Sequence, residues 1–237
     1  MPVLLPQDVH IWSARRPPIL PVDFEAVLSD GERTRAAGFF FQRHRLAYVF
    51  AHAILRDVLS RYLYCRPEDV RFGEDRFGKP FLDGTNCGQV LEFNLSHSGN
   101  LVLFALCQGQ RVGVDCEQIR RINDLLSISK SYFTPEECAF ILRQLPSDRE
   151  REFLRCWTRK EAYVKAVGRG LAIPLNSFDT QISRGNAAVF LESDLNSITE
   201  WEVANLDLCE GYVAAVAIEE GMHNLVHYEW CAAFAEQ

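Results

Sequence analysis

Two acidic residues at alternate positions are the side chains of this sequence best placed to bind a metal ion. Asp115 and Glu117 follow Val112-Gly113-Val114 in a stretch that predicts a β-strand, and residues two apart on a strand point to the same face. Two adjacent carboxylates repel each other unless water or a cation screens them. Mg²⁺ typically takes one or two carboxylates together with phosphate oxygens of a substrate. The pair therefore indicates either a magnesium site or a strand end that merely faces water.

A second set of candidate residues lies on a predicted helix. Trp157, Glu161 and Lys165 are spaced by four, so their side chains share one helical face. A glutamate–lysine pair at this spacing is usually a surface ion pair, but the tryptophan on the same stripe indicates that this face packs against protein. We expect Glu161 to be a third carboxylate for the metal or a general base, and Lys165 to face phosphate as a compact positive charge.

A third set is polar and lies between two apolar runs. Ser96, His97 and Ser98 precede Gly99, and we expect them to form a loop between two strands. The simplest interpretation is a polar turn that satisfies its own hydrogen bonds. A Ser–His nucleophile pair is the alternative, but the sequence lacks the Gly-x-Ser-x-Gly elbow, so a hydrolase triad is disfavoured.

Four weaker candidates are basic residues or their neighbours in less regular segments. Lys79 and Pro80 belong to a Gly-Lys-Pro loop, and Arg43 and Arg45 lie at the start of a predicted helix. Each is an ordinary surface residue unless an anion lies nearby.

The elements that must position these residues form two blocks of the same order, helices followed by strands. Ser29 with Glu32, and Thr134 with Glu137, have the spacing of a capping box and mark two helix starts. This order predicts an α+β fold with two similar halves, residues 1–112 and 113–237. Helices are expected over 29–37, 42–63, 125–133, 134 onward and 147–167, and strands over 10–12, 70–74, 90–95, 101–107, 111–117, 178–183, 187–191, 199–206, 212–218 and 225–230.

Composition excludes several classes of protein. The chain has 237 residues and a net charge of −7, divided as +1 in residues 1–112 and −8 in 113–237; an acidic chain is not a general nucleic-acid binder. No apolar run is long enough to span a membrane, and the N-terminus lacks the charge pattern of a signal peptide. Eight cysteines occur singly, which predicts free, mostly buried thiols and a cytoplasmic location. Lysine is scarce: only four of 25 basic residues are Lys, and three of them lie in the segments above.

Taken together, the segments resemble the Sfp-type 4′-phosphopantetheinyl transferases. The matching motifs occur in the order typical of that family across residues 33–171, and the last one is long and specific. They are Gly78-Lys79-Pro80, Asn94-Leu95-Ser96-His97-Ser98, Gly113-Val114-Asp115-Cys116-Glu117 and the run from Trp157 to Leu171.

The resemblance implies an enzyme of two halves related by a pseudo-twofold axis, with coenzyme A bound in the cleft between them. It implies transfer of the 4′-phosphopantetheine arm to a serine of a carrier protein of fatty-acid, polyketide or nonribosomal-peptide synthesis, with release of adenosine 3′,5′-bisphosphate. Mg²⁺, for which Mn²⁺ substitutes, is expected as cofactor, and the length suggests a monomer.

The resemblance also implies roles for single residues. Glu161 and Lys165 are the expected catalytic groups, and Glu161 is a base, a metal ligand or both. The expected metal ligands are Asp115, Glu117 and Glu161. The expected ligands of coenzyme A are Arg43, Arg45, Lys79, Pro80, Ser96, His97, Lys160 and Lys165.

Two other functions use the same residues. A non-catalytic module would bind coenzyme A without turnover, and a Mg²⁺-dependent phosphohydrolase would release phosphate from it without any carrier. Under the transferase hypothesis, Asp115→Ala is expected to abolish transfer and to leave the fold intact, because the residue is predicted to lie at a strand end.

Overall fold

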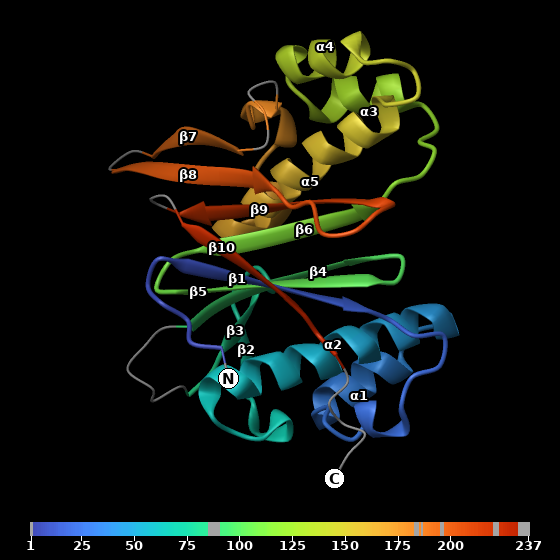
Figure 1. Cartoon of the computed structure of the whole chain (residues 1–237), viewed down its shortest axis with the longest axis vertical. Coiled ribbons are helices and arrows are strands. Elements are labelled where there is room, and N and C mark those ends of the chain that lie inside the picture. Colours follow the sequence, from blue (N-terminus) through green and yellow to red (C-terminus); the bar gives the residue numbers. More distant parts are fainter. Residues whose placement is uncertain are drawn as a thin grey trace.

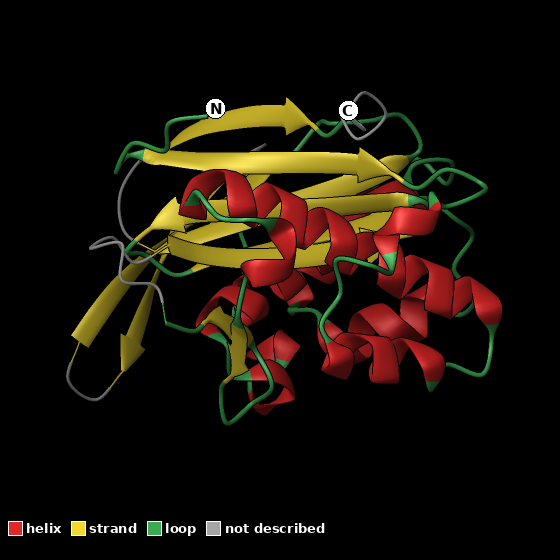
Figure 2. Cartoon of the chain, turned by 90° about the horizontal axis from the view of Figure 1, so that it is seen from below, coloured by secondary structure: helices red, strands yellow, loops and turns green. Residues whose placement is uncertain are grey.

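The chain folds into two packed sheets, each covered on its outer side by helices. The computed structural model describes residues 2–84, 91–182, 185, 187–194, 197–219 and 223–231. The two sheets stack in the middle of the molecule, and helices lie beyond them at both ends (Figure 1). Seen from below, most of the helices gather on one side of the strands (Figure 2). The α+β class and the organisation in two similar halves are therefore confirmed.

The first half combines a four-stranded sheet with two helices. α1 (Asp30–Ala37) and α2 (Gln42–Leu63) precede β4 (Leu91–Ser98) and β5 (Leu101–Gln108). The sheet has the order β10-β1-β5-β4, where β1 is Asp8–Arg15 and β10 is Asn224–Glu229. α2 packs on this sheet through its apolar residues and is buried on most sides over 49–51 and 53–60.

The second half repeats this plan with more helices. α3 (Leu125–Tyr132), α4 (Pro135–Arg143) and α5 (Arg149–Val167) follow β6 (Val112–Gln118). The sheet has the order β6-β9-β8-β7, with β7 at Ala187–Asp194, β8 at Ser197–Asn205 and β9 at Tyr212–Glu219. α5 covers β6, β8 and β9 through a buried cluster of its own.

The inner faces of the two sheets bury a shared apolar cluster. Aliphatic side chains of β1, β5, β6 and β9 meet there, among them Val9, Leu103, Val114 and Val216, and all four are fully buried. Burial of this apolar surface holds the halves together. β10 adds a further connection, because it pairs in parallel with β1 although it comes from the end of the chain.

A short hairpin extends from the first half toward the second. β2 (Phe72–Glu74) and β3 (Pro80–Leu82) form a two-stranded sheet among the described residues. Pro80 therefore does not break the hydrogen bonding of a larger sheet. The turn between them carries Gly78 and Lys79.

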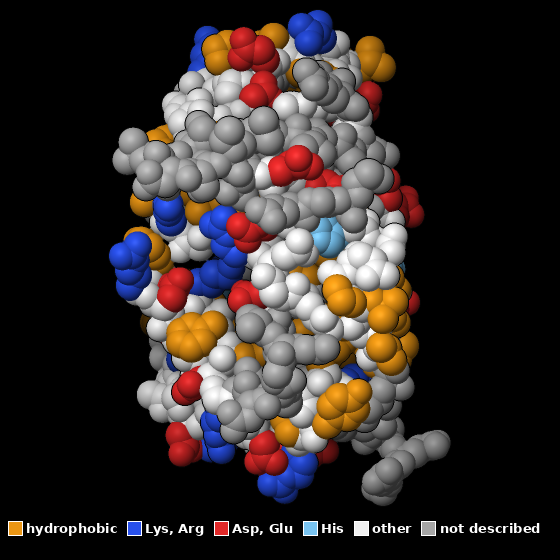
Figure 3. Space-filling view, turned by 90° about the vertical axis from the view of Figure 1, so that its left-hand side faces the viewer, with side chains coloured by type: hydrophobic (Ala, Val, Ile, Leu, Met, Phe, Trp, Pro, Cys, Tyr) orange, Lys and Arg blue, Asp and Glu red, His pale blue; other side chains and the backbone are white. Residues whose placement is uncertain are grey.

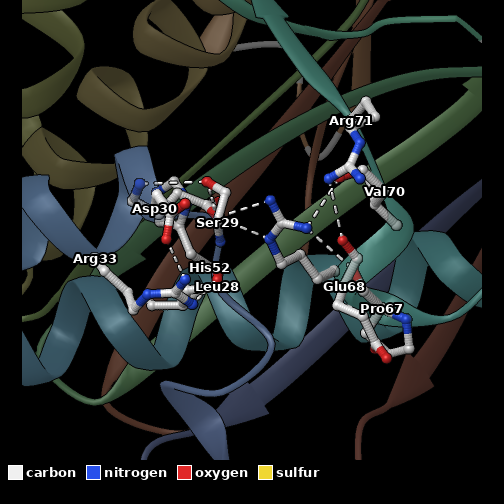
Figure 4. A network of polar contacts seen from close by, with 11 residues as sticks. Leu28, Ser29, Asp30, Arg33, His52, Pro67, Glu68, Val70 and Arg71 are labelled. Atoms are coloured by element: carbon white, nitrogen blue, oxygen red, sulfur yellow. Dashed lines mark hydrogen bonds and ion pairs between the residues drawn. The ribbon is translucent and has the colours of Figure 1, made fainter.

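A buried ion-pair network ties α1, α2 and this region together (Figure 4). The Glu32 carboxylate accepts a 2.8 Å hydrogen bond from the Arg56 Nε, and it contacts the His52 ring at 3.0 Å and the Ser29 backbone amide at 2.8 Å. Arg56 also donates to two backbone carbonyls within residues 67–70. The capping box expected at Ser29 is confirmed, and its glutamate does more than cap the helix, because it neutralises a guanidinium that is almost completely buried.

Three expectations about local structure are wrong. Residues 178–182 form no strand; the carbonyls of Phe178 and Thr180 instead accept side-chain hydrogen bonds from α5. Ser96, His97 and Ser98 belong to β4 rather than to a loop, and the turn consists of Gly99 and Asn100.

The third wrong expectation concerns the thiols. The seven cysteines outside the undescribed segments are free, but only Cys107, Cys116 and Cys156 are buried, while Cys65 and Cys231 are exposed. The eighth, Cys87, and Val90 of the expected strand 90–95 lie outside the described residues. Across the described parts of the chain, no helix is both long and apolar enough to cross a membrane.

Candidate active site

The centre of the candidate site is a buried cluster of an aspartate, a lysine and a serine. Asp115 lies on β6, Lys165 on α5 and Ser96 on β4. The Lys165 Nζ donates to the Asp115 Oδ1 at 2.6 Å and to the Ser96 Oγ at 3.0 Å, and the serine hydroxyl donates to the same Oδ1 at 2.8 Å. The cluster therefore joins the two halves of the molecule at the carboxylate predicted to hold a metal.

Asp115 is not at a strand end. It occupies the middle of β6 and is 6% exposed. The expectation that Asp115→Ala leaves the fold untouched is therefore wrong, because truncation would leave the half-buried Lys165 ammonium without its ion-pair partner.

The close approach of α5 to β6 depends on a glycine. A Cβ atom at Gly113 would lie 2.0 Å from the Ala162 carbonyl oxygen and 2.4 Å from the Ala166 backbone nitrogen. Because only glycine fits there, α5 can lie directly on the strand and bring Glu161 and Lys165 over its carboxylates. Asp115 and Glu117 lie on the same face of β6 as Gly113, and the opposite face enters the core.

Glu161 has the electrostatic surroundings of a base or a metal ligand. Burial raises its pKa above the usual value, the nearby Asp115 carboxylate raises it further, and the Lys165 ammonium partly opposes both effects. Glu117 adds a small contribution in the same direction as Asp115. The three carboxylates predicted as metal ligands thus influence one another. Lys165 contacts Asp115, and Arg120 lies 3.7 Å from Glu117, so two cations partly balance their negative charges.

A cavity of about 300 Å³ opens beside this cluster, between the two halves. On the face shown in Figure 3, Lys and Arg side chains gather around a hollow at mid-height, where the halves meet. The cavity is lined by Phe77, Gly78, Lys79, Pro80, Asn94 and Leu95 of the first half and by Glu161, Val164, Lys165, Gly168 and Gly170 of the second. Four of the predicted site residues therefore share one cavity: Lys79, Pro80, Glu161 and Lys165.

Lys79 bridges the cavity. Its Nζ donates a 3.1 Å hydrogen bond to the Ala166 carbonyl oxygen, in the last turn of α5, where a cation is favoured by the helix dipole. Burial lowers the pKa of Lys79, and the nearby Glu92 and Asp75 carboxylates oppose this effect.

Lys160 does not belong to the site, and the prediction that it faces phosphate is wrong. Its ammonium is fully buried on another side of α5, where it contacts the Glu137 carboxylate at 2.8 Å. It also donates to the carbonyl oxygens of Leu175 and Phe178 at 2.7 and 2.5 Å. The helical period explains this, because a residue one position before Glu161 points about 100° away from it.

Arg43 and Arg45, the arginines predicted to contact coenzyme A, are exposed. Neither lines the cavity between the halves or the second cavity described below. Arg45 pairs with Glu25 at 2.9 Å, and Arg43 contacts the His44 ring and lies over the Phe41 ring.

His97 points away from Ser96 and Ser98, because successive residues of β4 face opposite sides. Partial desolvation and the Lys165 charge lower its pKa, which favours a neutral imidazole at pH 7.

A second cavity, of about 490 Å³, shares Pro80 with the first. Its polar lining includes Arg35, Tyr48, His52 and Arg71, none of which was singled out from the sequence as a site residue. The His52 ring stacks on Tyr48 with 4.0 Å between centroids. Only Arg35 carried a signal in the sequence, since four arginines lie within residues 33–45; the others are brought there by the packing of α2 against the hairpin.

Asp115, Glu117 and Glu161 are the residues of the site that would hold a divalent metal. Within the described residues, no three Asp, Glu, His or Cys side chains lie close enough together to enclose an ion as the side chains stand. The donor chemistry nevertheless fits, because carboxylates are the ligands that Mg²⁺ prefers, and the charge of Asp115 adds to burial in raising the pKa of the nearby Glu161.

Comparison with known proteins agrees with this geometry. The family profile described as the 4′-phosphopantetheinyl transferase superfamily matches residues 111–217, and the profile of the N-terminal part of 4′-phosphopantetheinyl transferase matches residues 21–109. The chain is 36% identical to the 4′-phosphopantetheinyl transferase HetI of Nostoc sp. over 218 residues, which covers 91% of this chain and 89% of that protein. The chain belongs to the 4′-phosphopantetheinyl transferase superfamily.

Two further relatives have lower identity to this chain. The transferase Sfp of Bacillus subtilis is 28% identical over 67% of this chain and 68% of its own length. The transferase gsp of Aneurinibacillus migulanus is 30% identical over 69% of this chain and 65% of its own length. The resemblance to Sfp-type transferases is thereby confirmed, and the protein is a phosphopantetheinyl transferase.

Proposed function

We propose that this transferase moves the 4′-phosphopantetheine arm of coenzyme A to a serine hydroxyl of a carrier protein, with Mg²⁺ as cofactor and adenosine 3′,5′-bisphosphate as the product released. The observation that carries the proposal is the cavity between the halves. There, lysines from both halves and a glutamate with a raised pKa face the same space.

The bond changes define what the site must do. The oxygen of the carrier serine forms a new bond to the β-phosphorus, the bond from that phosphorus to the bridging oxygen breaks, and the bridging oxygen leaves with the adenosine bisphosphate. Negative charge grows on the leaving phosphate, so fixed cations near it lower the barrier. Lys165 and Lys79 supply two such cations from opposite walls of the cavity.

The serine proton needs an acceptor, and Glu161 is the group best suited to the role. Its raised pKa makes it a stronger base than a free carboxylate, and it lines the cavity. Asp115, Glu117 and Glu161 would hold the Mg²⁺, which when bound would neutralise charge on the diphosphate. A carboxylate that binds the metal is a weaker base. If Asp115 and Glu117 suffice as metal ligands, Glu161 would act as the base; if they do not, Glu161 would bind the metal.

The second cavity suits the adenosine bisphosphate end of coenzyme A. Arg35 and Arg71 place guanidinium groups at its wall, and guanidinium binds phosphate in a bidentate way. We therefore assign the 3′-phosphate to Arg35 rather than to Arg43 or Arg45. His97, which is exposed on β4, would contact the phosphates, whereas the Ser96 hydroxyl is buried and engaged by Asp115 and Lys165.

We also propose an oligomeric state, a location and a set of acceptors for the protein. One chain supplies both walls of the cavity, which favours a monomer of two halves that meet near residues 112 and 113. Free thiols are compatible with the reducing cytoplasm. Carriers of fatty-acid, polyketide and nonribosomal-peptide synthesis are the candidate acceptors.

The test is the intact mass of apo carrier proteins after incubation with the enzyme, coenzyme A and Mg²⁺. We expect a gain equal to one phosphopantetheine group with at least one carrier class. Asp115→Asn should lose the activity, and Asp23→Asn, at an exposed aspartate outside the site, should retain it. If no carrier gains mass although the protein binds coenzyme A, the chain is a binding module; if phosphate appears without a carrier, it is a phosphohydrolase.

A further inference from the structure

The two sheets meet through their edge strands β4 and β6 without sharing a backbone ladder. Three alternate residues of β4 place side-chain oxygens against three alternate backbone amides of β6. The Asn94 Oδ1 accepts from the Val114 amide at 2.9 Å, the Ser96 Oγ from the Cys116 amide at 3.3 Å, and the Ser98 Oγ from the Gln118 amide at 3.0 Å. We call these three β4 side chains the zipper.

The spacing of the zipper is constant. Each acceptor lies 20 residues before its donor, so the two strands run in parallel and in register. β6 is the edge strand of its sheet, and alternate amides of an edge strand have no ladder partner. The zipper supplies partners to these amides. The amides of Val114 and Cys116 are buried, where an unpaired N–H would be costly, and the amide of Gln118 is exposed.

The two serines of the zipper make a second hydrogen bond, and in each case the acceptor is a carboxylate of the site. The Ser96 hydroxyl donates to Asp115 and the Ser98 hydroxyl donates to the Glu117 Oε2, both at 2.8 Å. The equivalent position beside Asn94 is Gly113, where α5 leaves no room for a side chain. Of the three β6 positions that face the zipper, Gly113 has no room for a side chain, and the other two, Asp115 and Glu117, are carboxylates that the zipper contacts.

A hydroxyl has one proton to give. Because the Gln118 amide occupies a lone pair of Ser98, the position of this oxygen is set by the backbone of β6, and its proton is directed at Glu117. Glu117 also pairs with Arg120, 3.7 Å away, but the Arg120 side chain is 60% exposed and constrains the carboxylate weakly.

We propose that Ser98 is a positioning residue for phosphopantetheine transfer: it fixes the position of the Glu117 carboxylate, which together with Asp115 and Glu161 would hold a divalent cation. The inference rests on the proposed function, because it concerns the same three carboxylates. It assigns a role to Ser98, the last serine of the Ser-His-Ser segment. Ser98 lines neither of the cavities described above.

The test compares Ser98→Ala with the control Ser131→Ala, which removes an exposed hydroxyl that only bonds a carbonyl within α3. Loss of a partner that orients a metal ligand typically costs about 10- to 100-fold in metal affinity or activity. We expect kcat at a fixed, subsaturating Mg²⁺ concentration to fall by about that factor in Ser98→Ala, with the KM for coenzyme A unchanged, and Ser98→Thr to restore it.

Two further readouts do not depend on turnover. Mn²⁺ binding, measured from its electron paramagnetic resonance signal with no other ligand added, should weaken in Ser98→Ala and not in Ser131→Ala. Hydrogen exchange at the Gln118 amide should accelerate because its acceptor is gone. If Ser98→Ala does not fold, Ser98→Cys keeps the shape with a weaker donor and should show the same effects to a smaller degree.

The outcomes separate the two proposals. If the wild-type protein converts no carrier, the proposed function fails. If the wild type is active and Ser98→Ala or Ser98→Cys matches Ser131→Ala in both kcat and Mn²⁺ affinity, the positioning role is wrong while the proposed function stands. If the KM for coenzyme A rises instead and Mn²⁺ affinity is unchanged, Ser98 acts on substrate binding and the inference is overturned.

Discussion

Replacing Lys160 by methionine separates a structural lysine from the phosphate-binding lysine that the family resemblance implies. The side chain is completely buried, and its ammonium lies 2.8 Å from the Glu137 carboxylate. Glu137 in turn caps α4 and accepts hydrogen bonds from the backbone amide and the hydroxyl of Thr180. Methionine fills a similar volume but leaves this carboxylate buried without its counter-charge.

The magnitude follows from the burial of both partners. Removal of one partner of a buried ion pair typically costs about 3–5 kcal/mol. For a domain of 150–250 residues, 1 kcal/mol shifts the midpoint of thermal unfolding by about 2–4 °C, so Lys160→Met should lower Tm by about 6–20 °C. The exposed Lys130 provides a matched control, and Lys130→Met should change the free energy of unfolding by less than about 0.5 kcal/mol.

The assay combines thermal unfolding, followed by circular dichroism, with coenzyme A saturation kinetics well below the lowered Tm. The KM for coenzyme A should match that of the wild type because Lys160 lies outside the cavity. The double variant Lys160→Met/Glu137→Gln should recover part of the lost stability, with a coupling energy of about 0.5–3 kcal/mol. An unchanged Tm together with a KM raised tenfold or more would refute the structural role and restore Lys160 as a phosphate ligand.

Three other predictions follow from the same packing. Gly113→Ala should destabilise the protein by about 3 kcal/mol or more, measured by denaturant unfolding, because the added Cβ would overlap the Ala162 carbonyl oxygen; a loss below 1 kcal/mol would mean that α5 does not lie this close to β6. Glu161→Gln should abolish transfer and raise Tm at pH 7, since the raised pKa shows that the folded state disfavours the ionised carboxylate; a lower Tm would contradict this electrostatic account. Although burial opposes the effect, hydrogen bonds from His52 and Ser29 and the charge of Arg56 lower the pKa of Glu32 from 4.5 to about 2. Its contribution to stability is therefore present above pH 4.5 and lost as the pH falls toward 2, and Glu32→Gln should flatten the acid limb of a plot of Tm against pH.

Much of the secondary structure could be predicted from local signals. The helix expected over 42–63 has those bounds in the structure because an apolar stripe and its end at Tyr64 are both local features. The capping boxes at Ser29 and Thr134 are present for the same reason. Local signals fail where a partner from another element satisfies the backbone, as at residues 178–182, whose carbonyls accept from Lys160 and Arg159.

Only the features of the site that follow from the spacing of side chains along a strand or a helix could be predicted from the sequence. Alternation placed Asp115 and Glu117 on one face, and the helical period placed Glu161 with Lys165. Neither rule could show that Ser96 and Ser98 continue a strand, since a polar segment reads as a turn until β6 is beside it. Nor could they show that β10 completes the first sheet, because a parallel pairing between the two ends of the chain has no local signature.

The central claim is that the cavity between the halves transfers phosphopantetheine from coenzyme A to a carrier. The most direct measurement is a single-turnover reaction with excess enzyme, in which holo-carrier and adenosine 3′,5′-bisphosphate are quantified in the same sample by mass spectrometry. The account predicts that the two products form in equal amounts in the wild type and that neither forms in Asp115→Asn. Formation of adenosine bisphosphate without holo-carrier, or full product formation in Asp115→Asn, would contradict it.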